Sequence, residues 1–409
     1  MVYAPMGLGS IVCTWAAFSS VLLVSVTGAS SLPADLNGDG VVDHRDVEIV
    51  QGSLGAKDPN IIPIDGAAGG SFVLDQTGKT YVLQGPTTGH FIVQADNLVL
   101  DLNRNEVNGL PAGVASVTVQ GRDRITLRNG TIHGSPVGIT IRDSNDLHLE
   151  DLTVQDCLNE GIVVSSSNRI SLNRVACKGN YHGIVFSGVR DILATNCDVS
   201  ENRDIGIRCT GCNNASFNGI TARANATDGM DFAECHSVHV RGLQAVQNKD
   251  DGIDFRDTTC ASLSESVSDN DGPSLELDGG SDVTVRDSRY GDGADSEHLV
   301  GFNVVRRFSS LRVRVVDNNE APLVGARVEI HDTSQAPAGM TGQADLAFSL
   351  KTDYQGNLPA LDLLWYTRMG TLVTQSGPYR LRVTCPGFQV AEWSYDAHAP
   401  AEKTFMLRP

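Results

Sequence analysis

Apolar residues recur along the middle of the chain with a fixed spacing of 22 or 23 residues. Each repeat opens with a small residue, followed by two apolar residues that flank one variable position, as in Gly138-Ile-Thr-Ile141. Apolar residues at alternate positions are typical of a β-strand that buries one face. Eight repeats follow one another, and the residues that open them are Ser116, Gly138, Gly161, Gly183, Gly206, Gly229, Gly252 and Ser274.

A second alternating apolar pair follows in every repeat, and a third pair follows in most of them, as at Ile170/Leu172 and Val175/Cys177. Short strands of this kind bury their inward side chains only if the repeats stack in parallel, about 4.8 Å apart. An antiparallel sandwich gives no reason for a fixed period. The pattern therefore predicts an all-β chain with a right-handed parallel β-helix of about ten coils over residues 62–305.

The regions on either side of the repeats have different patterns. From about Leu311 the period is lost, and alternating strands separated by Asn-, Gly- and Pro-rich turns predict a small antiparallel β-sandwich over residues 309–409. The first 34 residues carry no charged side chain, and an apolar run over 11–26 ends in small residues. We expect a signal peptide over residues 1–29 and a protein that is secreted or held at the cell surface. No Lys or Arg precedes the run, which leaves an uncleaved membrane anchor as the alternative.

The charge balance excludes two classes of partner. The chain has 31 Lys and Arg against 49 Asp and Glu, so its net charge is −18. Phosphate backbones and anionic membranes are therefore poor partners, and we expect no nucleic acid binding. We also expect a monomer.

Nine cysteines are present, and eight follow the predicted signal peptide. Several fall at inward positions, so we expect buried free thiols, with Cys212 and Cys235 the pair best placed to bond.

Residues 30–58 contain an acidic loop with the ligand spacing of a calcium site. Oxygen ligands fall at loop positions 1, 3, 5, 7, 9 and 12, and Gly40 stands at position 6, where such loops turn sharply. The predicted Ca²⁺ ligands are Asp35, Asn37, Asp39, Val41 through its carbonyl, Asp43 and Asp46. The loop resembles the type I dockerin repeat. Dockerins use two such loops and this chain has one, so we expect a calcium-stabilised linker with weak or absent cohesin binding.

The middle position of the first strand points outward, and in a β-helix these positions form a column. Read along the chain, the column is Thr118, Thr140, Val163, Val185, Arg208, Asp231, Asp254 and Glu276. Its first half is uncharged, whereas its second half is charged. The turns just before the first strands add His182, Asp228, Asp250 and Asp251. Stacked carboxylates repel each other unless a proton or a cation intervenes, so this charged half is the candidate site.

Residues 62–305 resemble the pectin-lyase-like family of right-handed β-helix proteins. The segments ATDGMDF and KDDGIDF, at 226–232 and 249–255, resemble the N-T-D and D-D motifs of polygalacturonase-type glycoside hydrolases. This resemblance implies that Asp228, Asp250 and Asp251 protonate the leaving oxygen and activate water. The His-Gly and Arg-x-Lys motifs of that family are missing, and Asp-Gly is also an ordinary turn sequence. Pieces of the C-terminal region, such as the T-D-x-x-G at 352–356, resemble the carboxypeptidase regulatory-like domain.

Three interpretations of the charged column remain open at this point. In the first, an exported enzyme hydrolyses a polysaccharide with Asp228, Asp250 and Asp251, with Arg208 and His182 beside them. In the second, Asp231, Asp254 and Glu276 hold Ca²⁺ against a substrate carboxylate. Arg208 or His182 then removes a proton from the sugar, and the glycosidic bond is cleaved by elimination. In the third, the protein is not an enzyme, and it either binds glycans or is a structural protein of the cell surface. Convergence of the carboxylates in one groove favours an enzyme, whereas pairing of all of them with arginines favours the third interpretation.

Overall fold

The computed structural model describes residues 59–66, 68–110, 114–290, 297–334 and 345–409. The predicted signal peptide and the predicted calcium ligands from Asp35 to Asp46 lie outside these residues. Residues 62–409 form one compact unit. In the part of the chain that is described, no helix is long and apolar enough to span a membrane.

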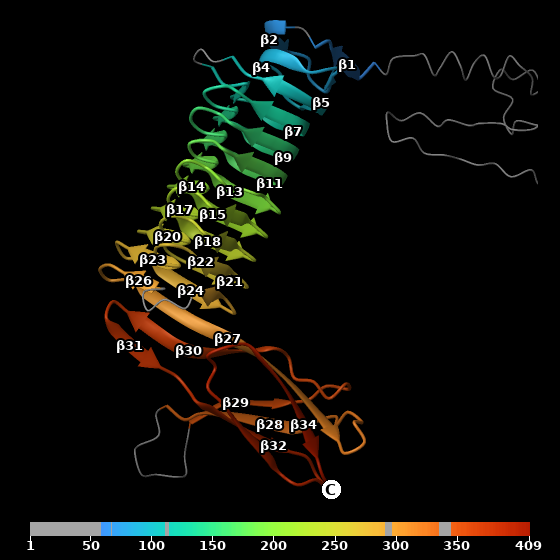
Figure 1. The fold of residues 1–409 in the computed structure, drawn as a ribbon. Coiled ribbons are helices and arrows are strands. Elements are labelled where there is room, and N and C mark those ends of the chain that lie inside the picture. The colour runs from blue at the N-terminus through green and yellow to red at the C-terminus, as the bar shows by residue number, and fades with distance from the viewer. Residues whose placement is uncertain (1–58, 67, 111–113, 291–296, 335–344) are drawn as a thin grey trace, which may run out of the picture. The chain divides into compact units, whose positions relative to one another are not determined.

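The repeats stack as the coils of a parallel β-helix (Figure 1), which confirms the predicted fold class. The first strand of each coil pairs in register with the same strand of the next coil, so that Ile162, for example, lies between Ile139 and Ile184. These first strands are β6 (Val117–Gln120), β8 (Ile139–Arg142), β10 (Ile162–Ser165), β12 (Ile184–Ser187), β14 (Ile207–Thr210), β17 (Met230–Ala233), β20 (Ile253–Arg256), β23 (Leu275–Asp278) and β26 (Glu297–Leu299).

The second and third predicted strands are continuous in the early coils and separate in the later ones. The continuous strands are β5 (Leu98–Asn108), β7 (Asp123–His133), β9 (Asn145–Gln155) and β11 (Asn168–Lys178). In later coils the second strands are β13 (Arg190–Thr195), β15 (Asn213–Asn218), β18 (His236–Arg241), β21 (Ala261–Ser264) and β24 (Asp282–Arg286), and the third are β16 (Thr221–Arg223), β19 (Gln244–Val246), β22 (Val267–Asp269) and β25 (Arg289–Tyr290). The bend between the two strands uses one residue at positive φ, such as Asp151 or Arg174.

The inward positions form one continuous apolar core. Phe186, Phe217, Phe232 and Phe255 contact one another in sequence, and all four are fully buried. The predicted inward residues Leu98, Leu100 and Leu102 are buried as well. The described cysteines are free thiols, Cys212 and Cys235 included, and most are buried. This agrees with the prediction that they serve as small apolar side chains.

A ladder of buried asparagines holds the turns that precede the first strands. The amide group of Asn202 donates to the side-chain oxygen of Asn225, and Asn225 donates to Asn248 in the same way, at 3.1 and 3.0 Å. The glycine after each turn is required by close packing, because a Cβ on Gly229 would lie 2.6 Å from the carbonyl oxygen of Gly252. The ladder and the glycines together fix the turns that carry the acidic residues of the candidate site.

The C-terminal region is built from two sheets that share an apolar core. One is antiparallel, with the strand order β29 (Asp345–Lys351), β28 (Arg327–Asp332), β32 (Tyr379–Thr384) and β33 (Ala391–Tyr395). The other continues the β-helix through β27 (Val304–Asp317), which pairs antiparallel with β30 (Leu361–Met369) and parallel with β34 (Ala401–Leu407). The hairpin partner of β30 is β31 (Leu372–Gln375). The expected antiparallel strands are therefore present, with one parallel pair in addition.

The N-terminal coils consist of β1 (Ile61–Ile64), β2 (Ala68–Leu74), β3 (Thr80–Leu83), β4 (Thr87–Val93) and β5. Strand β2 pairs with β4 and β4 with β6, so the first-strand sheet begins two coils before the regular repeat. Two tryptophan side chains of the C-terminal region pack against neighbouring residues. Trp365 lies under the guanidinium of Arg307, and Trp393 stacks on Tyr395.

Candidate functional site

The outward positions of the first strands form the predicted column. Arg208 of β14 pairs in register with Asp231 of β17, and Asp254 of β20 and Glu276 of β23 follow. The column continues to His298 of β26, whose Nδ1 lies 3.3 Å from Oε1 of Glu276. Sequence reasoning missed His298, because Glu297 occupies the inward position of that strand where every earlier coil has an apolar residue. We call Arg208, Asp231, Asp254, Glu276 and His298 the charged column.

Asp231 is neutralised by two arginines. Its Oδ2 accepts a hydrogen bond from Nε of Arg208 at 3.2 Å, and its Oδ1 accepts one from Nη2 of Arg256 at 2.6 Å. The Asp231 side chain is only 2% exposed, so these two contacts replace its lost hydration. Arg256 also lies 3.5 Å from Asp254. This part of the charged column is a ladder of ion pairs.

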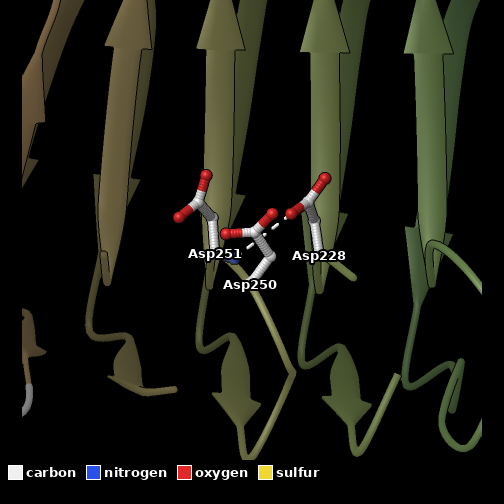
Figure 2. A group of neighbouring side chains, drawn as sticks. All are labelled: Asp228, Asp250 and Asp251. Atoms are coloured by element: carbon white, nitrogen blue, oxygen red, sulfur yellow. Dashed lines mark hydrogen bonds between the residues drawn. The ribbon is translucent and has the colours of Figure 1, made fainter. Parts of the chain in front are cut away.

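Three carboxylates, from Asp228, Asp250 and Asp251, converge in the turns before β17 and β20 (Figure 2). Asp228 lies in the turn before β17, and Asp250 and Asp251 lie in the turn before β20. One oxygen from each carboxylate lies within 4.8 Å of the others, and the backbone N–H of Asp251 donates to Oδ1 of Asp228 at 3.1 Å. Oxygens this close together could hold a metal ion. We call Asp228, Asp250 and Asp251 the acidic triad.

Burial raises the pKa values of several carboxyl groups within and beside the acidic triad, and it does so to different extents. Asp251 is buried, and the loss of hydration, followed by the nearby Glu276 carboxyl, raises its pKa to about 9. Burial also raises the pKa of Asp228 to about 6 and that of Asp254 to about 7. Asp250 is exposed to solvent. At neutral pH a protonated Asp251 therefore lies beside a carboxylate on Asp228.

Two buried oxygens at the site have no hydrogen-bond partner, namely Oδ1 of Asp251 and Oδ1 of Asp254. Buried polar atoms are nearly always paired in folded proteins, and exceptions concentrate where a ligand or a reacting group belongs. Both residues are more than nine-tenths buried. Both unpaired oxygens belong to the same coil, since Asp251 directly precedes β20 and Asp254 is part of that strand.

His182 occupies the edge of the site toward the N-terminal coils. Its Nε2 lies 3.2 Å from Nη1 of Arg208, so the histidine accepts this hydrogen bond and carries its proton on Nδ1, which faces Asp204 at 3.6 Å. Burial and the charge of Arg208 lower the pKa of His182. Asp204 in turn accepts a hydrogen bond from the Thr227 hydroxyl at 2.7 Å. A neutral His182 thus links Arg208 to the turns that carry the acidic triad.

The structure therefore brings the predicted residues of the β-helix to one face, in two chemically different groups. Asp228, Asp250 and Asp251 converge and have no ion pair within the described chain, whereas Asp231 pairs with both Arg208 and Arg256. Asp254 and Glu276 follow Asp231 in the charged column, which ends at His298. The column could be read from the repeat period, but the pairing of Asp231 with Arg256 depends on side-chain directions that the period does not specify.

The repeat region matches a family model described as "Right handed beta helix region" over residues 80–187 and 173–319, which together cover more than half of the chain. The chain belongs to this right-handed β-helix family. A search of curated protein sequences finds no match.

Three solved structures illustrate the likeness of fold. The periplasmic alginate epimerase AlgG has 16% identity and a TM-score of 0.39, with 60% of this chain and 77% of that chain covered. Tailspike protein 2 from the Escherichia coli O157:H7 bacteriophage CAB120 has 10% identity and a TM-score of 0.43, with 80% and 64% covered. The GH87 α-1,3-glucanase of Streptomyces thermodiastaticus has 10% identity and a TM-score of 0.40, with 59% and 62% covered. Likeness at this level concerns the fold alone and assigns no reaction to this chain.

Proposed function

We propose that this protein hydrolyses a glycosidic bond of a polysaccharide at the acidic triad. The observation that carries the proposal is the convergence of Asp228, Asp250 and Asp251 on one face of the β-helix, where no arginine or lysine of the described residues forms an ion pair with them. Glycoside hydrolysis requires a protonated carboxyl next to an ionised one, and burial gives the acidic triad both states at neutral pH. The resemblance of this segment to the N-T-D and D-D motifs supports the same assignment.

Each member of the acidic triad then has one role. Asp251 donates its proton to the leaving oxygen, and this transfer becomes favourable as the bond to the sugar breaks and negative charge develops on that oxygen. Asp228 is held by the backbone N–H of Asp251 and, with the exposed Asp250, accepts a proton from the attacking water. Arg208 is partly exposed and fixed by Asp231 and His182, so it binds substrate oxygens and orients the sugar.

Elimination assisted by calcium fits the same face less well. A cation bound by Asp231, Asp254 and Glu276 would have to replace the two arginines that already occupy both oxygens of Asp231. Arg208, paired with a buried carboxylate, is a poor proton acceptor. The lone pair on Nε2 of His182 is engaged by Arg208. Neither of the expected bases is therefore free to remove a proton from the substrate.

A second function is favoured by the spacing of the acidic triad. Its three oxygens suit a divalent cation, and a cation there would neutralise the acidic triad and allow the face to bind a glycan without cleaving it. We place this calcium-dependent glycan binding second, because a proton on Asp251 already relieves the repulsion between the carboxylates.

We propose that the chain is exported, that it acts as a monomer outside the cell or on its surface, and that residues Asp35 to Asp46 bind Ca²⁺ in a linker. The apolar run near the N-terminus and the loop spacing support these statements.

The test is incubation of the full chain with a panel of plant, algal and microbial polysaccharides, with and without EDTA, followed by assays for reducing ends and for unsaturated products. We expect new reducing ends and no unsaturated product, and EDTA should leave the rate unchanged. Asp251→Asn should lower turnover by about 10²–10⁴-fold without loss of fold. The matched control is Glu160→Gln, which stands at the equivalent position before Gly161 and should keep full activity.

Other outcomes assign other functions. Unsaturated products that require Ca²⁺ would replace hydrolysis by elimination. Glycan binding that EDTA abolishes, with no product of either kind, would establish the second function instead. If products form equally with Asp251→Asn and wild type, the catalytic residues lie elsewhere.

A further inference from the structure

An exposed aromatic side chain, Tyr181, lies at one end of the candidate site. It belongs to the turn before β12, and the equivalent turns of later coils carry the acidic triad before β17 and β20. The side chain is 46% exposed, and its ring contacts the ring of His182 edge to face, with the centroids 4.7 Å apart. Tyr181 therefore adjoins the site through a residue that the site already includes.

A continuous chain of contacts leads from Tyr181 to the acidic triad. His182 accepts a hydrogen bond from Arg208, and Arg208 donates to Asp231. The turns provide a second route through Thr227. The Thr227 hydroxyl donates a hydrogen bond to Asp204, and the Thr227 carbonyl accepts one from the backbone N–H of Asp250. Two to three coils separate Tyr181 from the acidic triad, which corresponds to about 10–15 Å along the helix axis. A polysaccharide lying along the axis covers this distance with a few sugar units.

The turn that holds Tyr181 is fixed on both sides. Its backbone N–H donates to the carbonyl of Asn159 in the preceding coil at 2.6 Å, and the carbonyl of Asn180 accepts from Arg203 in the following coil at 2.7 Å. The Arg203 guanidinium reaches further and donates to the carbonyls of Cys157 and Leu158. An aromatic ring on so firmly bonded a turn loses little conformational freedom when a ligand packs on it.

The turns change in chemistry along the β-helix. The turns of two coils before the site expose apolar side chains, Val114 at 40% and Leu158 at 56% exposure, and the turn before β12 exposes Tyr181. In the coils of the site they carry Lys249, Asp250 and Asp271, all exposed. A sugar ring has an apolar face of C–H groups and a polar rim, so it packs on an aromatic ring while its hydroxyl groups stay in water.

We propose that Tyr181 is a sugar-binding platform that holds a polysaccharide a few units away from the bond that the acidic triad cleaves. The position of the cleaved bond in this inference rests on the proposed function. The binding of the polysaccharide at Tyr181 does not depend on whether the polysaccharide is cleaved. It follows that the protein prefers long chains over short ones, because only a long chain contacts Tyr181 and the acidic triad together.

The experiment compares Tyr181→Ala with the wild type and uses the full chain. Affinity electrophoresis through gels that contain alginate, polygalacturonate or α-1,3-glucan identifies a polysaccharide that retards the Asp251→Asn protein. Calorimetry with a disaccharide and a hexasaccharide prepared from that polysaccharide then measures binding. Tyr181→Ala should weaken hexasaccharide binding by about 3–10-fold and leave disaccharide binding unchanged. Tyr181→Phe should bind as the wild type does, because the ring remains.

A matched control is Tyr354→Ala, since Tyr354 is 75% exposed in the C-terminal region and should have no effect. Equal melting temperatures establish that each variant is folded. Unchanged hexasaccharide binding by Tyr181→Ala overturns the platform, even if the protein hydrolyses the polysaccharide. A hexasaccharide that binds through Tyr181 without being cleaved by the wild type overturns the proposed hydrolysis and leaves the platform in place. If none of the three polysaccharides retards the protein, the platform is rejected, whereas the assays for reducing ends on the full panel still decide the proposed hydrolysis.

Discussion

The two halves of the outward column on the first strands share one backbone and differ in chemistry. In the first half the outward side chains are Thr118, Thr140, Val163 and Val185, and in the second half they are Arg208, Asp231, Asp254 and Glu276. All of them pair in one unbroken parallel register. The inward residues of both halves are equally apolar and buried.

The comparison shows that the charges are not needed to form the β-helix, because the first half forms the same coils without them. The second half instead contains groups that oppose folding. Burial raises the pKa values of Asp228, Asp251 and Asp254, and two carboxyl oxygens have no partner. Unfavourable groups gathered in one part of an otherwise regular structure are typical of a functional site.

The largest expected effect separates inward from outward positions on one strand. Ile184 is fully buried between Ile162 and Ile207, so Ile184→Asp places an unpaired carboxylate in the core. We expect a loss of about 3–5 kcal/mol in the free energy of unfolding, measured by urea denaturation. Val185→Asp on the outward face, beside Arg208, should change it by less than about 1 kcal/mol. Similar losses for both variants would mean that the inward and outward assignments are wrong.

The second effect is the dependence of stability on pH in the charged half. The folded-state pKa values of Asp228, Asp254 and Asp251 are raised to about 6, 7 and 9, so the folded protein binds more protons than the unfolded chain above about pH 4. Stability should therefore fall as the pH rises from about 4 to about 9. Asp254→Asn removes one of these groups and should raise the free energy of unfolding at about pH 8 by about 2–4 kcal/mol.

A control of opposite sign lies on the second strands of the coils that carry the uncharged half of the column. Arg169 lowers the pKa of Asp146 through a hydrogen bond on the helix surface, so this pair contributes stability above about pH 4 and loses it on acidification. Asp146→Asn should therefore weaken the protein slightly at neutral pH, whereas Asp254→Asn strengthens it. Melting curves across this pH range decide the matter, and a destabilised Asp254→Asn protein at about pH 8 would contradict the assignment of a raised pKa.

The third effect concerns the ion-pair ladder. Asp231→Asn removes the carboxylate that Arg208 and Arg256 share, and we expect a loss of about 1–3 kcal/mol. The cost is limited because both arginines are partly exposed and Arg256 retains Asp254. Thr140→Val, an outward change in the other half, should be nearly neutral in the same melting experiment. Equal effects of the two substitutions would show that Asp231 is not the buried partner of both arginines.

Much of the fold was accessible from the sequence because a β-helix repeats its chemistry as well as its backbone. Each inward apolar pair recurs every 22 or 23 residues, so the period alone predicts the register of residues such as Ile139 and Ile162. The bend within β9 was not accessible, since it depends on Asp151 at positive φ, and many other aspartates lie in turns. The start of β27 was also hidden, because the strand continues directly into the C-terminal sheets.

The candidate site was accessible only in part. The column followed from the period, and the convergence of Asp228, Asp250 and Asp251 was one of several alternatives. The choice between a surface ladder and a catalytic group depends on which carboxylates the arginines reach, and Arg256 takes Asp231 rather than any member of the acidic triad. Such choices are made by side-chain rotamers, which have no period.

The smallest effect tests whether a cation belongs to the charged half at all. The sequence predicts Ca²⁺ ligands in the acidic loop from Asp35 to Asp46, and the acidic triad could hold a metal ion as well. In the triad, the proton on Asp251 is an alternative to a cation. We expect calorimetry to detect one Ca²⁺ site that Asp39→Ala abolishes and Asp250→Asn retains. Because the loop lies outside the repeats, EDTA should leave the melting temperature of the β-helix nearly unchanged. If Asp250→Asn abolishes Ca²⁺ binding instead, a cation rather than a proton balances the acidic triad, and the charged half is a metal site.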